Sequence, residues 1–427
     1  MKKLLLAAIA VIALAPVATT GENVTLRFSW WGGSERHEGT LKVIKMFEEA
    51  NPGVTIKAEY MGWQGYLERL ATQIGSNSEP DIMQINWAWI DMFSRKGDGL
   101  YDLGKVKDSL NLAEYSESML NSGVSNGVLN ALPVSMTTRF FFWNKTTWDK
   151  AGAALPTTWD ELLAAGPKFK ALGDQYYPMD LEPIEGLYIL DAWLYEKYGK
   201  QIIHSTEPRF EVDEQELLDG ISFYKKLFDT HTAVSAKIRT ASSGQYDKPS
   251  EQVSEYVTGL WAGTFIWSSM LDLRISGPIG TGHEMVMGKM LTQDGTNPKP
   301  DRIGRPAMML TLGKNTKHPE LAAKFISFFL TDPEATKALG LARGIPAAKS
   351  AYQALMQENK ISAASLEAQA QLESVKIVYT NPVFEHERMR QFLLDVLESV
   401  SHEKETPEEA AGRMIRDGTK LIRRILR

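Results

Sequence analysis

The sequence contains no cysteine, and this absence excludes several kinds of protein. Disulfides, thiolate nucleophiles and a lipid-modified N-terminal cysteine all require a thiol. The seven histidines (His37, His204, His231, His283, His318, His386 and His402) never pair at the spacing of metal ligands. There is also no GxSxG elbow, P-loop or HExxH helix. We therefore predict no metal, no cofactor and no catalytic residue.

Long apolar runs are also scarce, and one run stands at the start of the chain. Lys2 and Lys3 precede the apolar segment Leu4–Val17, and small or polar residues follow through Gly21. This layout is typical of a secretory signal peptide, which we place at residues 1–21. A membrane anchor is the alternative, but the run is shorter than the ~20 residues that span a bilayer. We expect a soluble periplasmic protein without a lipid anchor.

The charge balance is acidic, with 47 basic and 53 acidic residues and a net charge of −6. Because no basic block is present, nucleic acid is not expected as a partner. A local group of arginines would still be able to hold an acidic ligand. The length remaining after the signal favours two or three domains.

The first part of the mature chain alternates between strand and helix patterns. Val24–Trp30 has the period-two alternation of a strand, and apolar residues at helical spacing follow from Ser34 to about Ala50. Further segments of this kind are a strand at Val54–Tyr60, a helix at Tyr66–Ile74 and a strand at Asp81–Asn86. The pattern predicts a parallel, helix-covered sheet.

Aromatic residues recur at the ends of these strands. The first strand ends in Trp30-Trp31, the second runs into Tyr60 and Trp63, and the third is followed by Trp87. In parallel sheets the ligand crevice lies outside the carboxyl ends of the strands. We therefore expect Trp30 to close the core and Trp31 to open into a cleft, with Gly32-Gly33 turning the chain. The alternative is that the rings only cap the sheet.

The rest of the chain is organised differently. We expect strands at Leu129–Ser135, Arg139–Asn144, Gly263–Trp267 and Gly304–Leu312, helices at Gly186–Tyr198, Glu214–Phe228 and Pro319–Leu330, and an almost entirely helical segment over residues 346–427. Glycosidase carboxylates act across space, so the sequence does not exclude such a pair, and Asp180 and Glu182 on a predicted strand are the best candidates. Two residues apart on a strand, they form a polar rim more readily than an acid and a nucleophile.

Several motifs together resemble a known family. They are "FEEANPGVTI", "EPDIMQIN", "ALPVS", "FFFWNKTTWDKAG", "LPTTWDELL", "GTFIWS", "HPELAAKFISFFLTDPEA" and "RGIPAAKS". In order and spacing the chain resembles the extracellular solute-binding proteins of carbohydrate ABC importers, of the maltodextrin-binding type. "FSWWGG" and "GYLERLATQIGSNSEPDIMQINWAW" look closest to the branch that binds oligogalacturonides from pectin.

The resemblance implies two α/β lobes that clamp a sugar between them. We place the crossovers near Pro133–Ser135, Val286–Met290 and Arg343–Pro346. The N-terminal lobe would then comprise residues 22–133 and 288–343, and the C-terminal lobe residues 134–287 and 344–427. The expected partners are an oligosaccharide and a membrane ABC permease, and the expected form is a monomer that closes on its ligand.

Sugar rings stack on aromatic side chains and need hydrogen-bond partners for their hydroxyls. Besides Trp30, the predicted stacking residues are Trp31, Trp63, Trp87, Trp193 and Trp267, and the predicted hydroxyl partners are Asn86 and Glu182. For an acidic sugar, arginine offers paired hydrogen bonds to a carboxylate. The available cations are Arg36, Arg139, Arg274, Arg302, Arg305 and Arg343, with Arg139 and Arg305 preferred. Two rival functions remain: a secreted hydrolase or lyase of the same sugars, and a lectin, which the α/β pattern disfavours.

Overall fold

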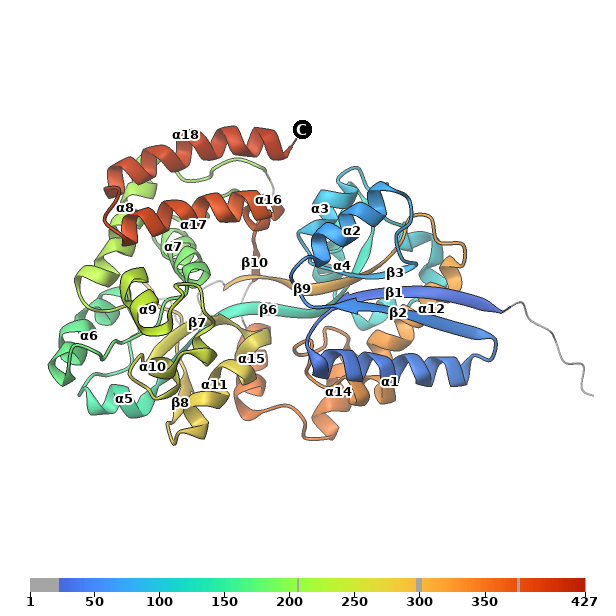
Figure 1. Ribbon diagram of the computed structural model, residues 1–427, viewed down its shortest axis with the longest axis horizontal. Coiled ribbons are helices and arrows are strands. Elements are labelled where there is room, and N and C mark those ends of the chain that lie inside the picture. Colours follow the sequence, from blue (N-terminus) through green and yellow to red (C-terminus); the bar gives the residue numbers. More distant parts are fainter. Residues whose placement is uncertain (1–22, 206, 297–301, 375–376, 427) are drawn as a thin grey trace, which may run out of the picture.

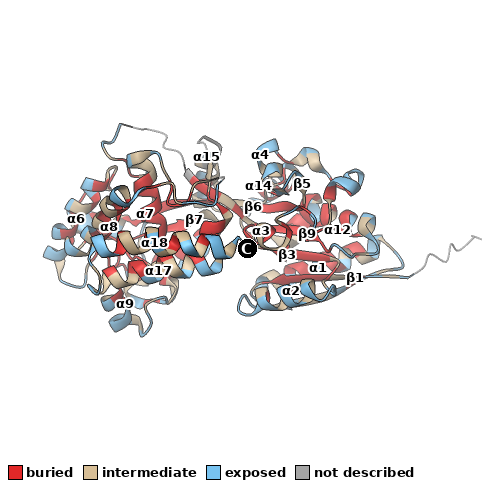
Figure 2. Ribbon diagram, turned by 90° about the horizontal axis from the view of Figure 1, so that it is seen from above, coloured by how far each residue is buried: buried red, intermediate tan, exposed pale blue. Residues whose placement is uncertain are grey.

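Two lobes lie side by side and are joined by long strands (Figure 1). The structure, a computed structural model, describes residues 23–205, 207–296, 302–374 and 377–426. The expected signal peptide, residues 1–21, lies outside the described residues. Each lobe has its own buried core, in which a sheet is covered by helices whose outer faces are exposed (Figure 2).

The first lobe forms around one end of a mixed sheet. Its elements are β1 (Val24–Trp31), α1 (Ser34–Ala50), β2 (Val54–Met61), α2 (Tyr66–Gly75), β3 (Ile82–Ile85), α3 (Trp89–Ser94), η1 (Leu103–Ser109), η2 (Leu112–Glu114), α4 (Glu117–Asn121), β4 (Val124–Ser125), β5 (Val128–Leu129), α12 (Pro319–Thr331), α13 (Pro333–Leu339) and α14 (Lys349–Gln357). In α1 the buried residues Thr40, Val43, Ile44 and Phe47 recur at helical spacing, which explains why this segment packs as a helix on the sheet.

The sheet of this lobe has the strand order β2-β1-β3-β9-β6, where β9 spans Arg302–Leu312 and β6 spans Ala131–Asn144. β1 is parallel to β2 and β3, as the sequence predicts. β9 is antiparallel to both β3 and β6, so the sheet is mixed and not wholly parallel. The reason is that β9 returns from the second lobe and enters the sheet from the opposite end.

The two expected strands around residue 135 are one continuous strand. β6 pairs with β9 in the first lobe and with β7 (Gly263–Trp267) and β8 (Met285–Met287) in the second. Register shifts between Pro133 and Ser135, and between Ser135 and Met136, mark the passage between the lobes. Such bulges bend a strand without ending it.

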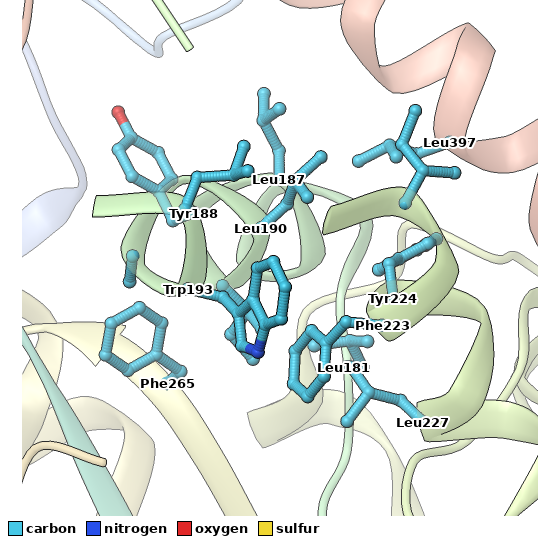
Figure 3. Close-up of a cluster of buried hydrophobic side chains, with 14 of the residues drawn as sticks. Leu181, Leu187, Tyr188, Leu190, Trp193, Phe223, Tyr224, Leu227, Phe265 and Leu397 are labelled. Carbon is cyan, nitrogen blue, oxygen red and sulfur yellow. The ribbon is translucent and has the colours of Figure 1, made fainter. Parts of the chain in front are cut away.

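The second lobe is mainly helical around β6 and β7. Its elements, besides β7 and β8, are α5 (Lys145–Lys150), α6 (Trp159–Leu172), α7 (Pro183–Tyr198), α8 (Glu214–Asp229), α9 (Ala236–Ser243), η3 (Ser250–Gln252), α10 (Ser254–Val257), η4 (Ser268–Met270), α11 (Leu271–Gly280), α15 (Ala363–Ser374), β10 (Ile377–Tyr379), α16 (Pro382–Glu385), α17 (Glu387–Ser401) and α18 (Pro407–Ile425). β10 pairs with β9, and the rest of the described last segment is mostly helical, as predicted. Part of the core is shown in Figure 3.

The structure moves two of the expected lobe boundaries. β8 pairs with β6, as β7 also does, so it belongs to the second lobe. Leu291 and Ile303 lie in the core of the same lobe. The middle crossover is therefore on β9, and not at Val286–Met290. Ala348 and Ala351 pack in the core of the first lobe, so α14 belongs with that lobe although residues from 344 onwards were assigned to the other.

Candidate functional site

A cleft of about 980 Å³ lies between the lobes at the carboxyl end of β1. The first lobe contributes Trp31, Glu35, Arg36 and Trp63, and the second contributes Ser268–Leu273. The lining is completed by Lys360, Ser365 and residues at or just before the third crossover: Gly340, Leu341, Ala342, Gly344 and Ile345. The cleft therefore has walls from both lobes, which is the arrangement that lobe closure requires.

Two tryptophans, Trp31 and Trp63, form the aromatic wall of the cleft, and Trp89 packs against both. Trp31 is only 8% exposed, and its ring centroid lies 5.2 Å from that of Trp63 and 5.4 Å from that of Trp89. Trp63 stacks on Trp89 at 5.5 Å and is 41% exposed. Trp63 is thus the ring that offers a free surface to a ligand, and Trp31 holds it in place from behind.

Arg36 lies over the turn between β1 and α1. Its Nε and Nη2 donate to the carbonyl of Ala342 at 3.1 and 2.8 Å, and Nη1 donates to the carbonyl of Trp31. Gly32 makes room for this side chain, because a Cβ there would lie 2.5 Å from Arg36 Cδ. Burial lowers the pKa of Arg36 to about 10 and outweighs the opposing effect of Glu35.

Arg343 lies beside Arg36 but deeper. It donates from Nε to Gln84 Oε1 at 2.8 Å and from Nη2 to Thr40 Oγ1 at 2.9 Å, while Nη1 has no hydrogen-bond partner among the described residues. Burial, and secondly the charge of Arg36, place the pKa of Arg343 well below its ordinary value. Within the described part of the chain, the bonds of both arginines go to neutral oxygens and to no carboxylate.

The N-terminus of α1 points into the same region. Its N-cap is Gly33, which has no side chain to accept from the free backbone N–H groups of the first turn. The positive end of a 17-residue helix therefore adds to the two arginines. Glu35 and Asp272 also line the cleft, but Asp272 is engaged by the hydroxyls of Ser362 and Ser365. Among the lining residues Arg36 and Lys360 balance Glu35 and Asp272, and Arg343 behind the lining adds one further cation near the exposed aromatic face.

Arg139 and Arg305, the preferred cations of the sequence analysis, are not in this cleft. Arg305 Nε forms a 2.6 Å ion pair with Glu385 Oε1, so its carboxylate partner is already supplied by the chain. Arg139 is 2% exposed, and its guanidinium carbon lies 4.1 Å from the ring centroid of Tyr188. Both guanidinium carbons lie within 4.6 Å of the Trp267 ring centroid. Burial lowers the pKa of Arg139 to about 10.

Four other residues that were predicted to bind the ligand pack or pair with residues of the protein itself. Trp30 is fully buried against Phe28 and Tyr60, and Trp193 stacks on Phe223 in the second core (Figure 3). Glu182 pairs with Arg274 at 2.6 Å and accepts from Ser250. Asn86 accepts from the backbone N–H of Ala88. None of the four lines the cleft, because their partners lie within their own lobe.

The remaining predicted residues divide between two places. Trp267 is 8% exposed and directly precedes the lining residues Ser268 and Ser269. Trp87 lines a separate pocket. The side chain of Arg302 lies outside the described part. Sequence reasoning missed the two serines, although they follow the "GTFIW" strand, and it missed the carbonyl of Ala342 because backbone contacts leave no residue signature.

The suspected carboxylate pair is neutralised by internal partners. Asp180 pairs with Arg239 at 2.7 Å, with both side chains fully buried, and Glu182 pairs with Arg274. Neither carboxylate is therefore placed as a free acid or nucleophile. The described residues also include no group of three or more His, Asp or Glu side chains arranged to hold a metal ion. In the same part of the chain, no helix has both the length and the apolar character needed to cross a bilayer.

Comparisons with known proteins agree with the fold. A putative binding protein of Brucella abortus is 29% identical over 53% of this chain and 54% of its own length, so the match spans about half of that relative. The diacetylchitobiose binding protein DasA of Streptomyces coelicolor is 25% identical over 82% of this chain and 78% of its own length.

A solved structure is also similar. It is a periplasmic oligogalacturonide binding protein of Yersinia enterocolitica in complex with saturated digalacturonic acid. It is 35% identical, covers 94% of this chain and 100% of its own, and has a TM-score of 0.85. The model of the bacterial extracellular solute-binding proteins matches residues 33–336. This confirms the resemblance found in the sequence: the chain belongs to the bacterial extracellular solute-binding protein family.

Proposed function

We propose that the protein captures an acidic oligosaccharide of the oligogalacturonide type in the cleft between its lobes. In this proposal the loaded protein closes as a monomer in the periplasm and presents the sugar to a membrane ABC permease. The relatives support the sugar class, since one is named for diacetylchitobiose and one is bound to digalacturonic acid. The chemistry of the cleft supports the acidic ligand.

One observation carries the choice of an anion. Arg36 lines the cleft and Arg343 lies behind it, and among the described residues both bond only to neutral oxygens, beside the uncapped N-terminus of α1. A buried cation without a counter-charge is costly, and a ligand carboxylate would relieve that cost. Arg36, which lines the cleft, is the residue placed to meet the carboxylate, and Arg343 strengthens the field from behind.

Trp63 supplies the second half of the recognition. Its exposed face is a surface on which the C–H face of a pyranose ring would stack. The hydroxyls of Ser268 and Ser269 on the opposite wall are suited to bond the hydroxyls of the sugar. An oligosaccharide with a carboxylate on each ring fits this combination better than a neutral sugar, which would leave the arginines without a charged partner.

Calorimetry with matched ligands tests the proposal. We expect digalacturonate to bind and a neutral galactose disaccharide of the same length to bind poorly. Arg36→Gln should weaken the binding of digalacturonate by about 1.5–3 kcal/mol, because a charge-assisted hydrogen bond is lost. The matched control is Arg209→Gln, since Arg209 is an exposed cation that pairs with Glu207 away from the cleft.

Two results would contradict the proposal. Equal affinity for the acidic and neutral disaccharides would remove the acidic ligand and leave the family assignment intact. Shortening of longer oligogalacturonides by the purified protein, followed by chromatography of the products, would favour the rival enzyme.

A further inference from the structure

Strand β3 is buried along its whole length and contains one polar residue. Ile82, Met83 and Ile85 are apolar, and Gln84 between them is fully buried. The strand lies next to β1, which carries Trp31 at its end (Figure 1). A buried amide costs free energy unless its donor and its acceptor are both paired, so the contacts of Gln84 show what the amide does here.

The amide of Gln84 joins an arginine to the carbonyl that precedes the glycine turn. Its Oε1 accepts from Arg343 Nε at 2.8 Å, and its Nε2 donates to the carbonyl of Trp31 at 3.2 Å. The same carbonyl accepts from Arg36 Nη1 at 3.2 Å. Gln84 therefore connects the two cations of the site and needs both its donor and its acceptor to do so.

Thr40 makes a second neutral bridge between the same two arginines. Its Oγ1 accepts from Arg343 Nη2 at 2.9 Å and donates to the carbonyl of Arg36 at 2.7 Å. The backbone of Arg343 is held as well, since its carbonyl accepts from Ser135 Oγ at 2.6 Å. Among the described residues, the groups that bond Arg343 are therefore uncharged, and they fix its position without compensating its charge.

Other buried arginines of this chain are paired with a carboxylate. Arg239 forms a 2.7 Å ion pair with Asp180, and Arg274 forms a 2.6 Å ion pair with Glu182. A carboxylate is the usual partner of a buried guanidinium, because an uncompensated charge is costly inside a protein. A glutamate at residue 84 would be as long as the glutamine and would accept from the same Nε atom. The amide thus stands where a counter-charge would fit.

We propose that Gln84 determines the charge specificity of the cleft: as a neutral amide it positions Arg343 and leaves the positive charge of Arg343 available to an anionic ligand held by Arg36. This inference rests on the proposed acidic ligand. Gln84 is not among the residues that line the cleft, so it acts on the ligand through the two arginines. A glutamate would keep Arg343 in place and cancel its charge, whereas an apolar residue would do neither.

Titration calorimetry on the full chain tests this role with two variants and two ligands. The ligands are digalacturonate and the neutral galactose disaccharide of the same length. Gln84→Glu should weaken the binding of digalacturonate by about 10- to 100-fold, because the new charge opposes the ligand carboxylates. It should leave the binding of the neutral disaccharide unchanged. Gln84→Met, which removes both hydrogen bonds and adds no charge, should weaken digalacturonate by at most about 5-fold.

The matched control is Gln73→Glu. Gln73 lies on α2 of the same lobe and does not line the cleft, so this variant adds the same charge away from the two arginines. Its affinity for digalacturonate should stay within about 2-fold of the wild type, because a distant charge is largely screened by salt. If Gln84→Glu does not fold, Arg343→Gln takes its place, since it removes the same positive charge and adds no carboxylate. It should weaken digalacturonate about 10-fold or more and spare the neutral disaccharide.

Two results overturn the inference and leave the proposed function standing. In the first, the wild type prefers digalacturonate and Gln84→Glu, or Arg343→Gln in its place, keeps that preference. In the second, Gln84→Met weakens both disaccharides as much as Gln84→Glu does, which is the result expected if Gln84 only holds the fold together. Equal affinity of the wild type for the two disaccharides would instead refute the acidic ligand itself, and this inference with it.

Discussion

Removing the Trp63 ring should separate ligand affinity from stability. Trp63 is 41% exposed and contributes one face to its stack on Trp89, so Trp63→Ala removes little buried area and should lower the free energy of unfolding by less than about 2 kcal/mol. Loss of stacking should weaken the binding of the oligosaccharide by about 1–3 kcal/mol, the scale measured for nucleic-acid bases that stack on aromatic side chains. That corresponds to roughly 5- to 150-fold in Kd.

Titration calorimetry and thermal unfolding of the same sample provide the assay. Leu273→Ala is the matched control, because Leu273 is 57% exposed and lines the same cleft but has no ring face. Its effect on affinity should be clearly smaller. Trp31→Ala should behave in the opposite way: this ring is 8% exposed and packs on three aromatic neighbours, so stability should fall by about 3–5 kcal/mol. If Trp63→Ala melts early and keeps full affinity, the assignment of Trp63 to the ligand is refuted.

Further predictions concern the arginine turn and two buried carboxylates. Gly32→Ala should displace the Arg36 side chain. In calorimetry, the binding of digalacturonate should weaken by at least the value of one hydrogen bond, about 1 kcal/mol. Unchanged affinity would mean that Arg36 does not contact the ligand. Glu385→Ala leaves Arg305 buried without its partner and should cost about 3–5 kcal/mol in denaturant unfolding, whereas an unchanged midpoint would show that the pair contributes nothing. Burial raises the pKa of Asp191 to about 7, above its ordinary value of 3.8, so the folded state holds the proton more tightly and stability falls as pH rises between these values. Asp191→Asn should therefore unfold at a higher temperature than the wild type at pH 8, by up to roughly 4 kcal/mol in stability, and the two should converge near pH 3; a constant difference across this range would contradict the shift.

Local patterns predicted much of the fold. The alternation at Val24–Trp30 and the helical spacing in α1 correspond closely to β1 and α1. These signals depend on neighbours in the chain, so a sequence reveals them. The direction of β9 does not depend on neighbours: it is set by a crossover from the other lobe. The continuity of β6 was hidden for a similar reason: two strands were expected with a crossover near Pro133–Ser135, and the structure has one strand that passes through it with a bulge.

The sequence predicted the position of the candidate site better than it predicted which charged residues line it. Aromatic residues at strand ends indicated the cleft edge, and Trp31 and Trp63 line it. Residue type alone gave no means of separating the arginines: Arg305 and Arg36 look alike in sequence, but one faces Glu385 and the other faces the carbonyl of Ala342. Those partners lie about 80 and 300 residues away along the chain, so the distinction depends on tertiary structure.

The position of β9 in the first sheet has a consequence for the order of folding. β9 lies between β3 and β6, where Ile82 pairs with Leu312 and Ala131 pairs with Thr311. A growing chain cannot complete the first sheet until residue 312 has been made, even though β1, β2 and β3 were made much earlier. Pairings of such long sequence separation form slowly, because a large loop must close before they stabilise anything. The first lobe therefore stays incomplete during most of synthesis.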